Sequence, residues 1–443
     1  MKMRISFCTV IACLVFAANL HAQDAPGLPM LTLRQAIEIA LKNNYSIQLS
    51  QNNSTIAKNN VTLGNARALP TVTGNVSSSN SLQNTTQTRT DNTVTRINNA
   101  NNTGISYGVN LNWTVFDGFG MFANYDALKQ RSALGQVLLR DTVQATLANV
   151  LTGYYDLVNQ NEQIKALRAA IDISRTQLRY ANDKFQVGRV SRLDVLNAQV
   201  NYNTDTASLI TQRQQYKAAQ IKLNQLLVRD LQTNFNVADT IVVDQNLKLG
   251  DILSIAQSQN PMILASQISQ RLAEINLKQI QSTRYPLITV GTGYVASTNN
   301  TPASLITRRT QLNGLTYGIA GTINIFDGFN QWRKERNAKL QINNAGLGVN
   351  QTKLNIDAQI NTLYSSYLSG LDLITLGQSN VAIAKRNLDI SLEKYKIGNI
   401  TPLEIRVAQQ NYINSQVRFF DAQYQSKIAE ITLKQITASV DLQ

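Results

Sequence analysis

The chain has 443 residues and a formal net charge of +14, yet charged side chains occupy only 15% of its positions. That share lies well below the figure of about 25% for ordinary globular proteins. The Lys and Arg residues are spread along the chain without a prominent run. A positive net charge raises the question of a nucleic-acid partner, but charges that are few and scattered indicate solvated helix faces instead.

Residues 1–22 have the pattern of a secretory signal peptide. A basic start precedes a short apolar run, and Ala22 closes a suitable cleavage site. The apolar run is shorter than the roughly 20 residues that a transmembrane helix needs. A lipoprotein cleavage site at Cys13 is the alternative, although the apolar residues continue beyond that cysteine. We expect cleavage just before Gln23.

Cleavage there would remove every thiol and imidazole group of the chain. Cys8, Cys13 and His21 are its only cysteines and histidine. Without them the chain cannot build a Cys/His metal site, a Ser-His-Asp triad or a cysteine nucleophile. We therefore expect no enzyme activity, no metal and no cofactor.

Apolar residues alternate with polar ones from Ile105 to Val115. A period of two places one face of a β-strand in an apolar medium and the other in a polar medium. Such a strand, at about 3.3 Å per residue and tilted, spans the roughly 30 Å of a bilayer core. We expect Leu111 to face lipid and Asn110 to face a lumen, with Ile323 and Asn324 in the matching positions of a second strand.

A strand-to-helix junction follows this strand, and it occurs twice. The two copies are Tyr107–Phe119 (YGVNLNWTVFDGF) and Tyr317–Phe329 (YGIAGTINIFDGF). In each copy an Asp-Gly pair separates the strand from a helical pattern, and the acid is well suited to cap the first amides of that helix. The junction residues are Asp117, Gly118, Asp327 and Gly328.

These and other landmarks show that the chain is internally duplicated. The first repeat, 23–240, is predicted to hold a helix, a β-hairpin at 70–116, a long helix at 118–185, a turn and a helix at 191–230. The second repeat, 241–443, is predicted to hold a helix, a β-hairpin at 286–326, a long helix at 328–396, a turn and a helix at 401–438. The polar stretches 77–103 and 296–313 are expected to be external loops.

Each repeat supplies two membrane-length strands, so one chain supplies four. Four strands cannot close a barrel with an interior, and an open sheet edge is not tolerated in lipid. The chain must therefore oligomerise, and three copies would give 12 strands, which is wide enough for a pore. The helices of about 66 residues show coiled-coil spacing and would extend roughly 100 Å.

The turn after each long helix carries the signals that end one helix and begin the next. A glycine suits the left-handed residue that ends the helix, and a hydroxyl followed three positions later by an acid forms a capping box. The residues concerned are Gly188, Ser191 and Asp194 in the first turn and Gly398, Thr401, Pro402 and Glu404 in the second. A well-capped helical hairpin without further function would explain both acids.

Taken together and in order, these landmarks resemble the TolC-like outer-membrane efflux proteins. The resemblance covers essentially the whole chain after residue 22 and includes its duplication. It implies a mixed α/β membrane protein, a homotrimer whose 12-stranded outer-membrane barrel continues as a long α-helical coiled-coil barrel through the periplasm of a Gram-negative cell. It also implies a passive exit duct for drugs or other small molecules. Its partners would be outer-membrane lipid, a periplasmic adaptor (membrane fusion) protein and an inner-membrane RND, ABC or MFS transporter. The exit duct of a type I protein secretion system is the alternative.

The resemblance also implies a gate where the helical turns meet around the threefold axis. Asp194 and Glu404 match acidic positions of that gate, and Tyr395 matches a tyrosine that braces the closed form. The match is incomplete, because Val407 and Asn197 stand where a second acid is expected one helical turn further on. We expect three Glu404 carboxylates to line the constriction, while Asp194 pairs with Tyr395 or a nearby Arg to hold it closed. Simple helix capping is the alternative for both acids.

Overall fold

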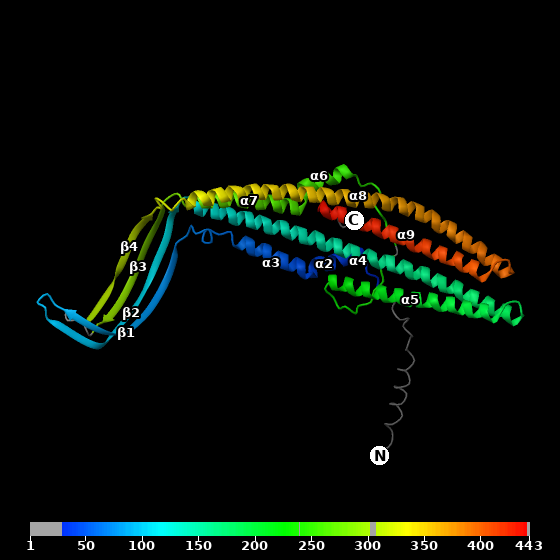
Figure 1. Ribbon diagram of the computed structural model, residues 1–443, viewed down its shortest axis with the longest axis horizontal. Helices are drawn as coiled ribbons and strands as arrows, with labels where there is room; N and C mark the ends of the chain where they lie inside the picture. Colours follow the sequence, from blue (N-terminus) through cyan, green and yellow to red (C-terminus); the bar gives the residue numbers. More distant parts are fainter. Residues whose placement is uncertain (1–28, 239, 302–306, 441–443) are drawn as a thin grey trace, which may run out of the picture.

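A computed structural model describes residues 29–238, 240–301 and 307–440, so the expected signal segment 1–22 lies outside the described residues. The molecule is elongated, with a β-sheet at one end and long helices running away from it to a distant tip (Figure 1). This arrangement of a four-stranded sheet and a predominantly helical body confirms the predicted fold class.

The strands pair in chain order to form one antiparallel sheet, with β1 and β4 at its edges. The strands are β1 (Thr71–Thr88), β2 (Val94–Asp117), β3 (Leu287–Asn300) and β4 (Arg309–Thr322). The register aligns apolar side chains in rows across the sheet. Val109 pairs with Tyr294, which pairs with Leu315, and Val72 pairs with Leu111. These rows form a continuous apolar face that is mostly exposed in the single chain.

The opposite face of the sheet carries small and polar residues. On it, Asn110 Nδ2 donates a 2.8 Å hydrogen bond to Asn75 Oδ1. A Cβ atom at Gly108 would lie 2.7 Å from the carbonyl oxygen of Tyr294, which explains the glycine at this position. The two faces therefore differ in polarity, and glycine permits close packing on the polar one.

The polar stretches 77–103 and 296–313 are not the loops that we expected. Within the described residues the hairpins stay paired far into both stretches, and the ladder is supplemented by contacts such as the 2.7 Å hydrogen bond between the Ser77 and Ser106 hydroxyls. The observed limits are Thr88 and Val94 in the first hairpin and Asn300 and Arg309 in the second. Because β3 pairs with β2 only as far as Thr103, the outer part of the first hairpin extends as a two-stranded ribbon.

The strand β4 also differs from expectation at its other end. It ends at Thr322, opposite Leu287. Ile323 and Asn324 therefore lie beyond the strand, and our assignment of these two residues to opposite faces of a strand was wrong.

Helices form the body of the molecule. They are α2 (Leu33–Asn43), α3 (Tyr45–Asn59), α4 (Gly120–Gln186), α5 (Arg192–Leu226), α6 (Leu249–Gln259), α7 (Pro261–Ser282), α8 (Asn330–Ile397) and α9 (Pro402–Ile436). With 67 and 68 residues, α4 and α8 extend about 100 Å each. None of the helices in the described residues has an apolar stretch long enough to cross a lipid bilayer.

Each repeat begins with two helices where we expected one, and an asparagine separates them. The Asn44 side chain accepts a hydrogen bond from the amide of Ser46 and donates a 3.0 Å bond to the carbonyl of Leu226, at the end of α5. In the second repeat Asn260 caps α7 in the same way and donates a 2.8 Å bond to the carbonyl of Ile436. These caps therefore hold the first helices of each repeat to the end of its last helix.

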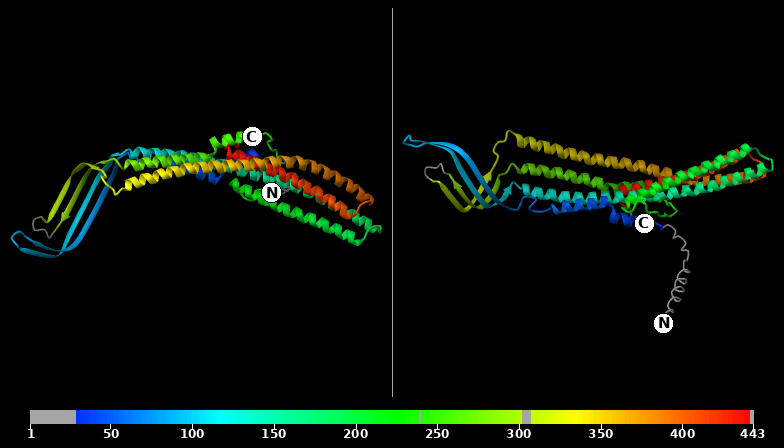
Figure 2. Two further views of the ribbon diagram at one scale, coloured as in Figure 1. Left: turned by 45° about the horizontal axis from the view of Figure 1, so that its top comes forward. Right: turned by 90° about the horizontal axis from the view of Figure 1, so that it is seen from below.

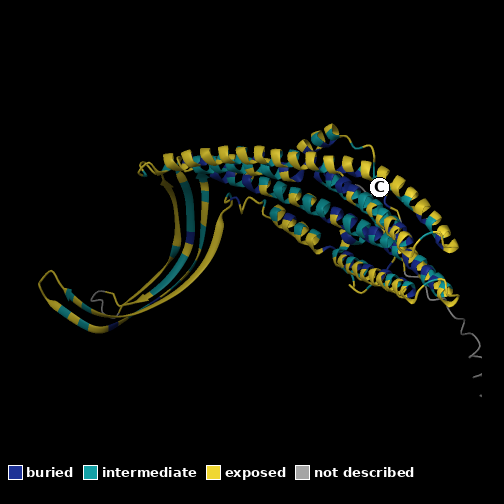
Figure 3. Cartoon of the chain, turned by 45° about the vertical axis from the view of Figure 1, so that its right-hand side comes forward, coloured by how far each residue is buried: buried dark blue, intermediate teal, exposed yellow. Residues whose placement is uncertain are grey.

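Two shorter helices pack end to end along each long helix. Helices α3 and α5 lie along successive parts of α4, and α7 and α9 lie along successive parts of α8 (Figures 1 and 2). The main hydrophobic core lies where these pairs meet, around Val150, Leu157 and Leu223, and Phe235 of the inter-repeat segment packs into it. The helical ends nearer the sheet and the tip are more exposed (Figure 3). The core thus fixes the middle of the molecule, from which the sheet and the tip extend in opposite directions.

Candidate functional site

Both strand-to-helix junctions turn through two consecutive residues of left-handed backbone. Gly118 and Phe119 have φ values of 70° and 68°, and Gly328 has a φ of 67°. The carboxylate before each glycine caps the new helix, because Asp117 Oδ1 accepts a 3.0 Å hydrogen bond from the amide of Met121. Asp327 Oδ2 accepts a 2.7 Å bond from the amide of Gln331 in the same way. The junction therefore redirects the chain from the sheet into α4 and α8.

An ion pair that sequence reasoning missed fastens this junction. Arg284, just after α7, grips Glu335 on α8 with two nitrogens, and its Nη2 lies 2.7 Å from Glu335 Oε2. These hydrogen bonds hold the pKa of the Glu335 carboxyl below its ordinary value. No sequence signal links the two residues, because they lie far apart in different elements.

The first turn at the tip has the capping geometry that the sequence predicts. Gly188 has a φ of 72° just after α4. Ser191 Oγ accepts a 3.3 Å hydrogen bond from the amide of Asp194, and Asp194 Oδ2 accepts a 2.9 Å bond from the amide of Ser191. The Asp194 carboxylate is thus used as a cap in the single chain.

The second turn repeats this arrangement. Gly398 ends α8 with a φ of 85°, and Pro402 is the first residue of α9. Thr401 Oγ1 accepts a 3.3 Å hydrogen bond from the amide of Glu404, and Glu404 Oε2 accepts a 2.7 Å bond from the amide of Thr401. Glu404 also lies on the rim of a groove of about 760 Å³ between α8 and α9, beside the exposed side chains of Leu403 and Val407.

Tyr395 lies buried at the end of α8 and contacts the other hairpin. Lys184 Nζ lies 4.3 Å from the centre of the Tyr395 ring and donates a 2.8 Å hydrogen bond to the Tyr395 carbonyl. Burial raises the pKa of the Tyr395 hydroxyl, and the negative charge of Asp194 raises it further. The Asp194 charge therefore acts on Tyr395 through space, while the hydrogen bonds of its carboxylate go to Ser191.

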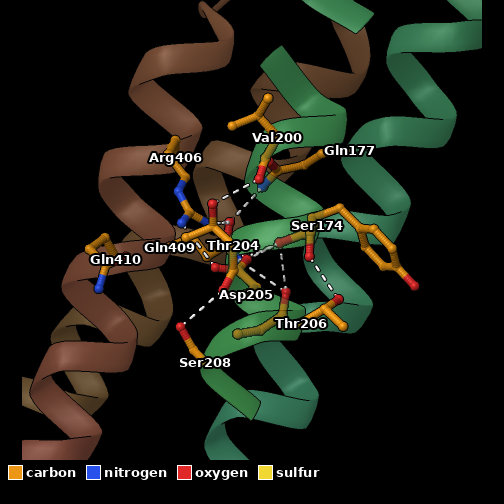
Figure 4. A network of polar contacts seen from close by, with 12 residues as sticks. Ser174, Gln177, Val200, Thr204, Asp205, Thr206, Ser208, Arg406, Gln409 and Gln410 are labelled. Carbon is orange, nitrogen blue, oxygen red and sulfur yellow. Dashed lines mark hydrogen bonds and ion pairs between the residues drawn. The ribbon is translucent and has the colours of Figure 1, made fainter. Parts of the chain in front are cut away.

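A buried polar network, which the sequence did not reveal, lies behind the tip (Figure 4). Arg406 on α9 grips Asp205 on α5 with two hydrogen bonds of 2.8 and 2.9 Å. Gln409 Nε2 lies 3.1 Å from Asp205 Oδ2 and 2.9 Å from Ser174 Oγ on α4. Gln177 Nε2 donates a 3.1 Å bond to Gln409 Oε1. Three helices are thereby joined at one point.

Comparison with known proteins identifies the family. A model of the outer membrane efflux protein family matches residues 36–228 and 252–439, which is most of the chain. The chain is a member of the outer membrane efflux protein family. The two matched segments also correspond to the two repeats of this efflux protein, which confirms the internal duplication.

Individual relatives agree with this assignment. The efflux protein is 25% identical over 409 residues to the outer membrane efflux protein BepC of Brucella suis, covering 92% of this chain and 85% of the relative. It is 21% identical to the outer membrane protein TolC of Escherichia coli, covering 78% of this chain and 72% of the relative. The description of the family and the name of the Brucella relative favour efflux over the alternative of protein secretion.

Solved structures show the same fold. The outer membrane channel CmeC of Campylobacter jejuni matches with a TM-score of 0.75 at 18% identity, covering 92% of this chain and 85% of that one. VceC of Vibrio cholerae matches with a TM-score of 0.74 at 15% identity, covering 92% and 96%. These structures show the fold, and membership of the outer membrane efflux protein family makes the chain an outer-membrane exit duct that extends into the periplasm.

Proposed function

We propose that three copies of the efflux protein assemble around one axis to form a 12-stranded barrel continued by a helical barrel. The observation that carries this proposal is the four-stranded sheet with an apolar face and two unpaired edges. Because lipid offers no partner for the backbone groups of an edge strand, β4 of one chain must pair with β1 of the next.

The polar face of the sheet would then line the channel, and its apolar face would contact the outer membrane. The duct would conduct drugs or other small molecules passively, since the energy comes from an inner-membrane transporter of the RND, ABC or MFS class. A periplasmic adaptor protein would join that transporter to the helical tip.

We further propose that the tip is the gate of this duct. Glu404 is exposed on a groove at the end of the helical hairpin, where three copies can face one axis. Asp194 and Tyr395 would hold the closed form, and the nearness of the Asp194 charge to the Tyr395 hydroxyl supports this pairing. Helix capping by both acids is compatible with this role, because each carboxylate has a second lone-pair site that remains available.

Crosslinking in mild detergent tests the assembly. We expect a ladder that stops at three chains, and we expect heating to dissociate the trimer into single chains. A stable folded monomer in detergent, with no crosslinked species, would contradict the proposed barrel.

A further inference from the structure

The network of Ser174, Gln177, Asp205, Arg406 and Gln409, here called the tip network, is buried within a single chain except at Arg406, whose side chain is 18% exposed. Gln409 is 0% exposed, Ser174 1% and Asp205 5%. No neighbouring chain is needed to exclude water from the Asp205 carboxylate and the Gln409 amide. The network is therefore a property of each protomer, unlike the exposed residues at the tip.

The tip network connects the two helical hairpins of one chain. Asp205 lies on α5 and Ser174 on α4, whereas Arg406 and Gln409 lie on α9. In Figure 4 the side chains from α9 reach across to those from α4 and α5, and the hydrogen bonds converge on the Asp205 carboxylate. Movement of α9 along the other hairpin would break several of these bonds together.

The ion pair between Arg406 and Asp205 is not duplicated in the other repeat. At the 210-residue spacing that relates Asp194 to Glu404, the counterpart of Arg406 is Leu196 and the counterpart of Asp205 is Ser415. Leucine and serine at the counterpart positions cannot form such an ion pair. Apolar residues can pack two helices together, but a buried bidentate pair also specifies one relative position.

The tip network lies next to the proposed gate. Arg406 is two residues after Glu404 on the same helix, so the position of α9 determines where the Glu404 carboxylate lies. We propose that Arg406 and Asp205 are positioning residues of the gate. They clamp α9 to the α4–α5 hairpin and so hold Glu404 in its place in the closed gate. This inference rests on the proposed function of the tip as a gate.

Two measurements on the full chain in its assembled form test the clamp. The first is the distance distribution between spin labels attached through Ser208→Cys on α5 and Gln410→Cys on α9, both exposed beside the tip network. The second is single-channel recording in planar bilayers. Cys8 and Cys13 are the only native cysteines, and both fall in the expected signal segment, so the labels can be placed selectively.

The first variant is Arg406→Leu, which introduces the leucine found at the counterpart position 196. The second is Asp205→Asn, which removes the charge but keeps the size and shape of the side chain. It serves as the test if Arg406→Leu fails to fold. The matched control is Asp421→Asn, because Asp421 also joins α9 to α4, through hydrogen bonds of 3.1 Å from Asn159 and 3.0 Å from Gln163, but lies further from the tip. We expect the clamp variants to broaden the label distances and to raise the open fraction about tenfold. The control should match the parent in both.

The possible results separate the two proposals. Narrow, parent-like distances in folded Asp205→Asn and Arg406→Leu trimers would overturn the clamp. Broad distances with a parent-like open fraction would overturn its role in positioning the gate. If the parent and all clamp variants insert without conducting, the proposed function is overturned, while the label distances still decide whether the network clamps the hairpins.

Discussion

Lys184 at the end of α4 lies 4.3 Å from the centre of the Tyr395 ring at the end of α8, and its ammonium also donates to the Tyr395 carbonyl. The two long helices of the duplicated chain are thus joined directly at the tip. Of the two proposed gate acids, Asp194 at the start of α5 lies near enough to this buried tyrosine to raise the pKa of its hydroxyl.

The first prediction separates gating from capping at these acids. Glu404→Gln should shift the ion selectivity of single channels, because it removes three charges from the constriction, and Asp194→Asn should raise open-state conductance without loss of trimer. If the acids are caps alone, both variants should conduct like the parent and differ from it only by about 1 kcal/mol in stability.

The second prediction concerns the two faces of the sheet. Leu111→Arg should destabilise the assembled barrel by about 2–4 kcal/mol if the residue lies near the bilayer midplane. Asn110→Arg, one position along the strand, should assemble and alter conductance instead. The assembly of each variant is measured as the yield of trimer after refolding into lipid vesicles. Its conductance is then measured by channel recording. Equal assembly of the two variants would show that the assigned faces are wrong.

The third prediction uses the duplicated junction glycines as a matched pair. Both have positive φ, so alanine should cost about 1 kcal/mol at either position. At Gly118 a Cβ atom would also overlap the carbonyl oxygen of Ser282. A Cβ atom at Gly328 would meet Asn330 Nδ2 at 3.9 Å, which is ordinary van der Waals contact. Gly118→Ala should therefore lower the thermal midpoint of the trimer more than Gly328→Ala. Equal losses would indicate that a neighbouring chain crowds Gly328.

The fourth prediction concerns pH and the Arg284–Glu335 pair. The folded pKa of Glu335 lies below the ordinary value of 4.5, so its stabilising effect is present above that pH and is lost as the pH falls through the lowered pKa. Thermal unfolding at a series of pH values should show Glu335→Gln less stable than the parent at neutral pH and equal to it in acid. Glu38→Gln is the control, because the Arg34–Glu38 pair is exposed. If the difference in thermal stability between Glu335→Gln and the parent is the same at every pH, the carboxylate charge is not its cause.

Local patterns in the sequence were sufficient to predict much of this structure. The alternation around Leu111 predicted a strand with two unlike faces, and the hydroxyl–acid spacing at Thr401 and Glu404 predicted the cap. The outer hairpins were missed because their residues are polar on both faces, so backbone pairing leaves no alternation in the sequence. The break at Asn260 did have a readable signal in the proline that follows it.

The tip network could not have been predicted in the same way. Its partners are brought together by the relative position of two repeats, and hydrogen bonds such as that between Gln409 and Ser174 join residues 235 positions apart. Helical periodicity identifies a buried face, but it does not say which residue of a distant helix lies opposite. A partly buried Arg on one helix and a buried Asp on another look like ordinary surface charges until the helices are placed.

The unpaired edges of β1 and β4 also constrain the route by which the protein reaches its final location. A lone chain entering the bilayer would expose two rows of unbonded amides and carbonyls to hydrocarbon. If three chains form the proposed barrel, insertion of one chain at a time is therefore disfavoured, and the subunits must meet before or during their entry into the outer membrane. The rate of barrel assembly should accordingly depend on the concentration of single chains in the periplasm.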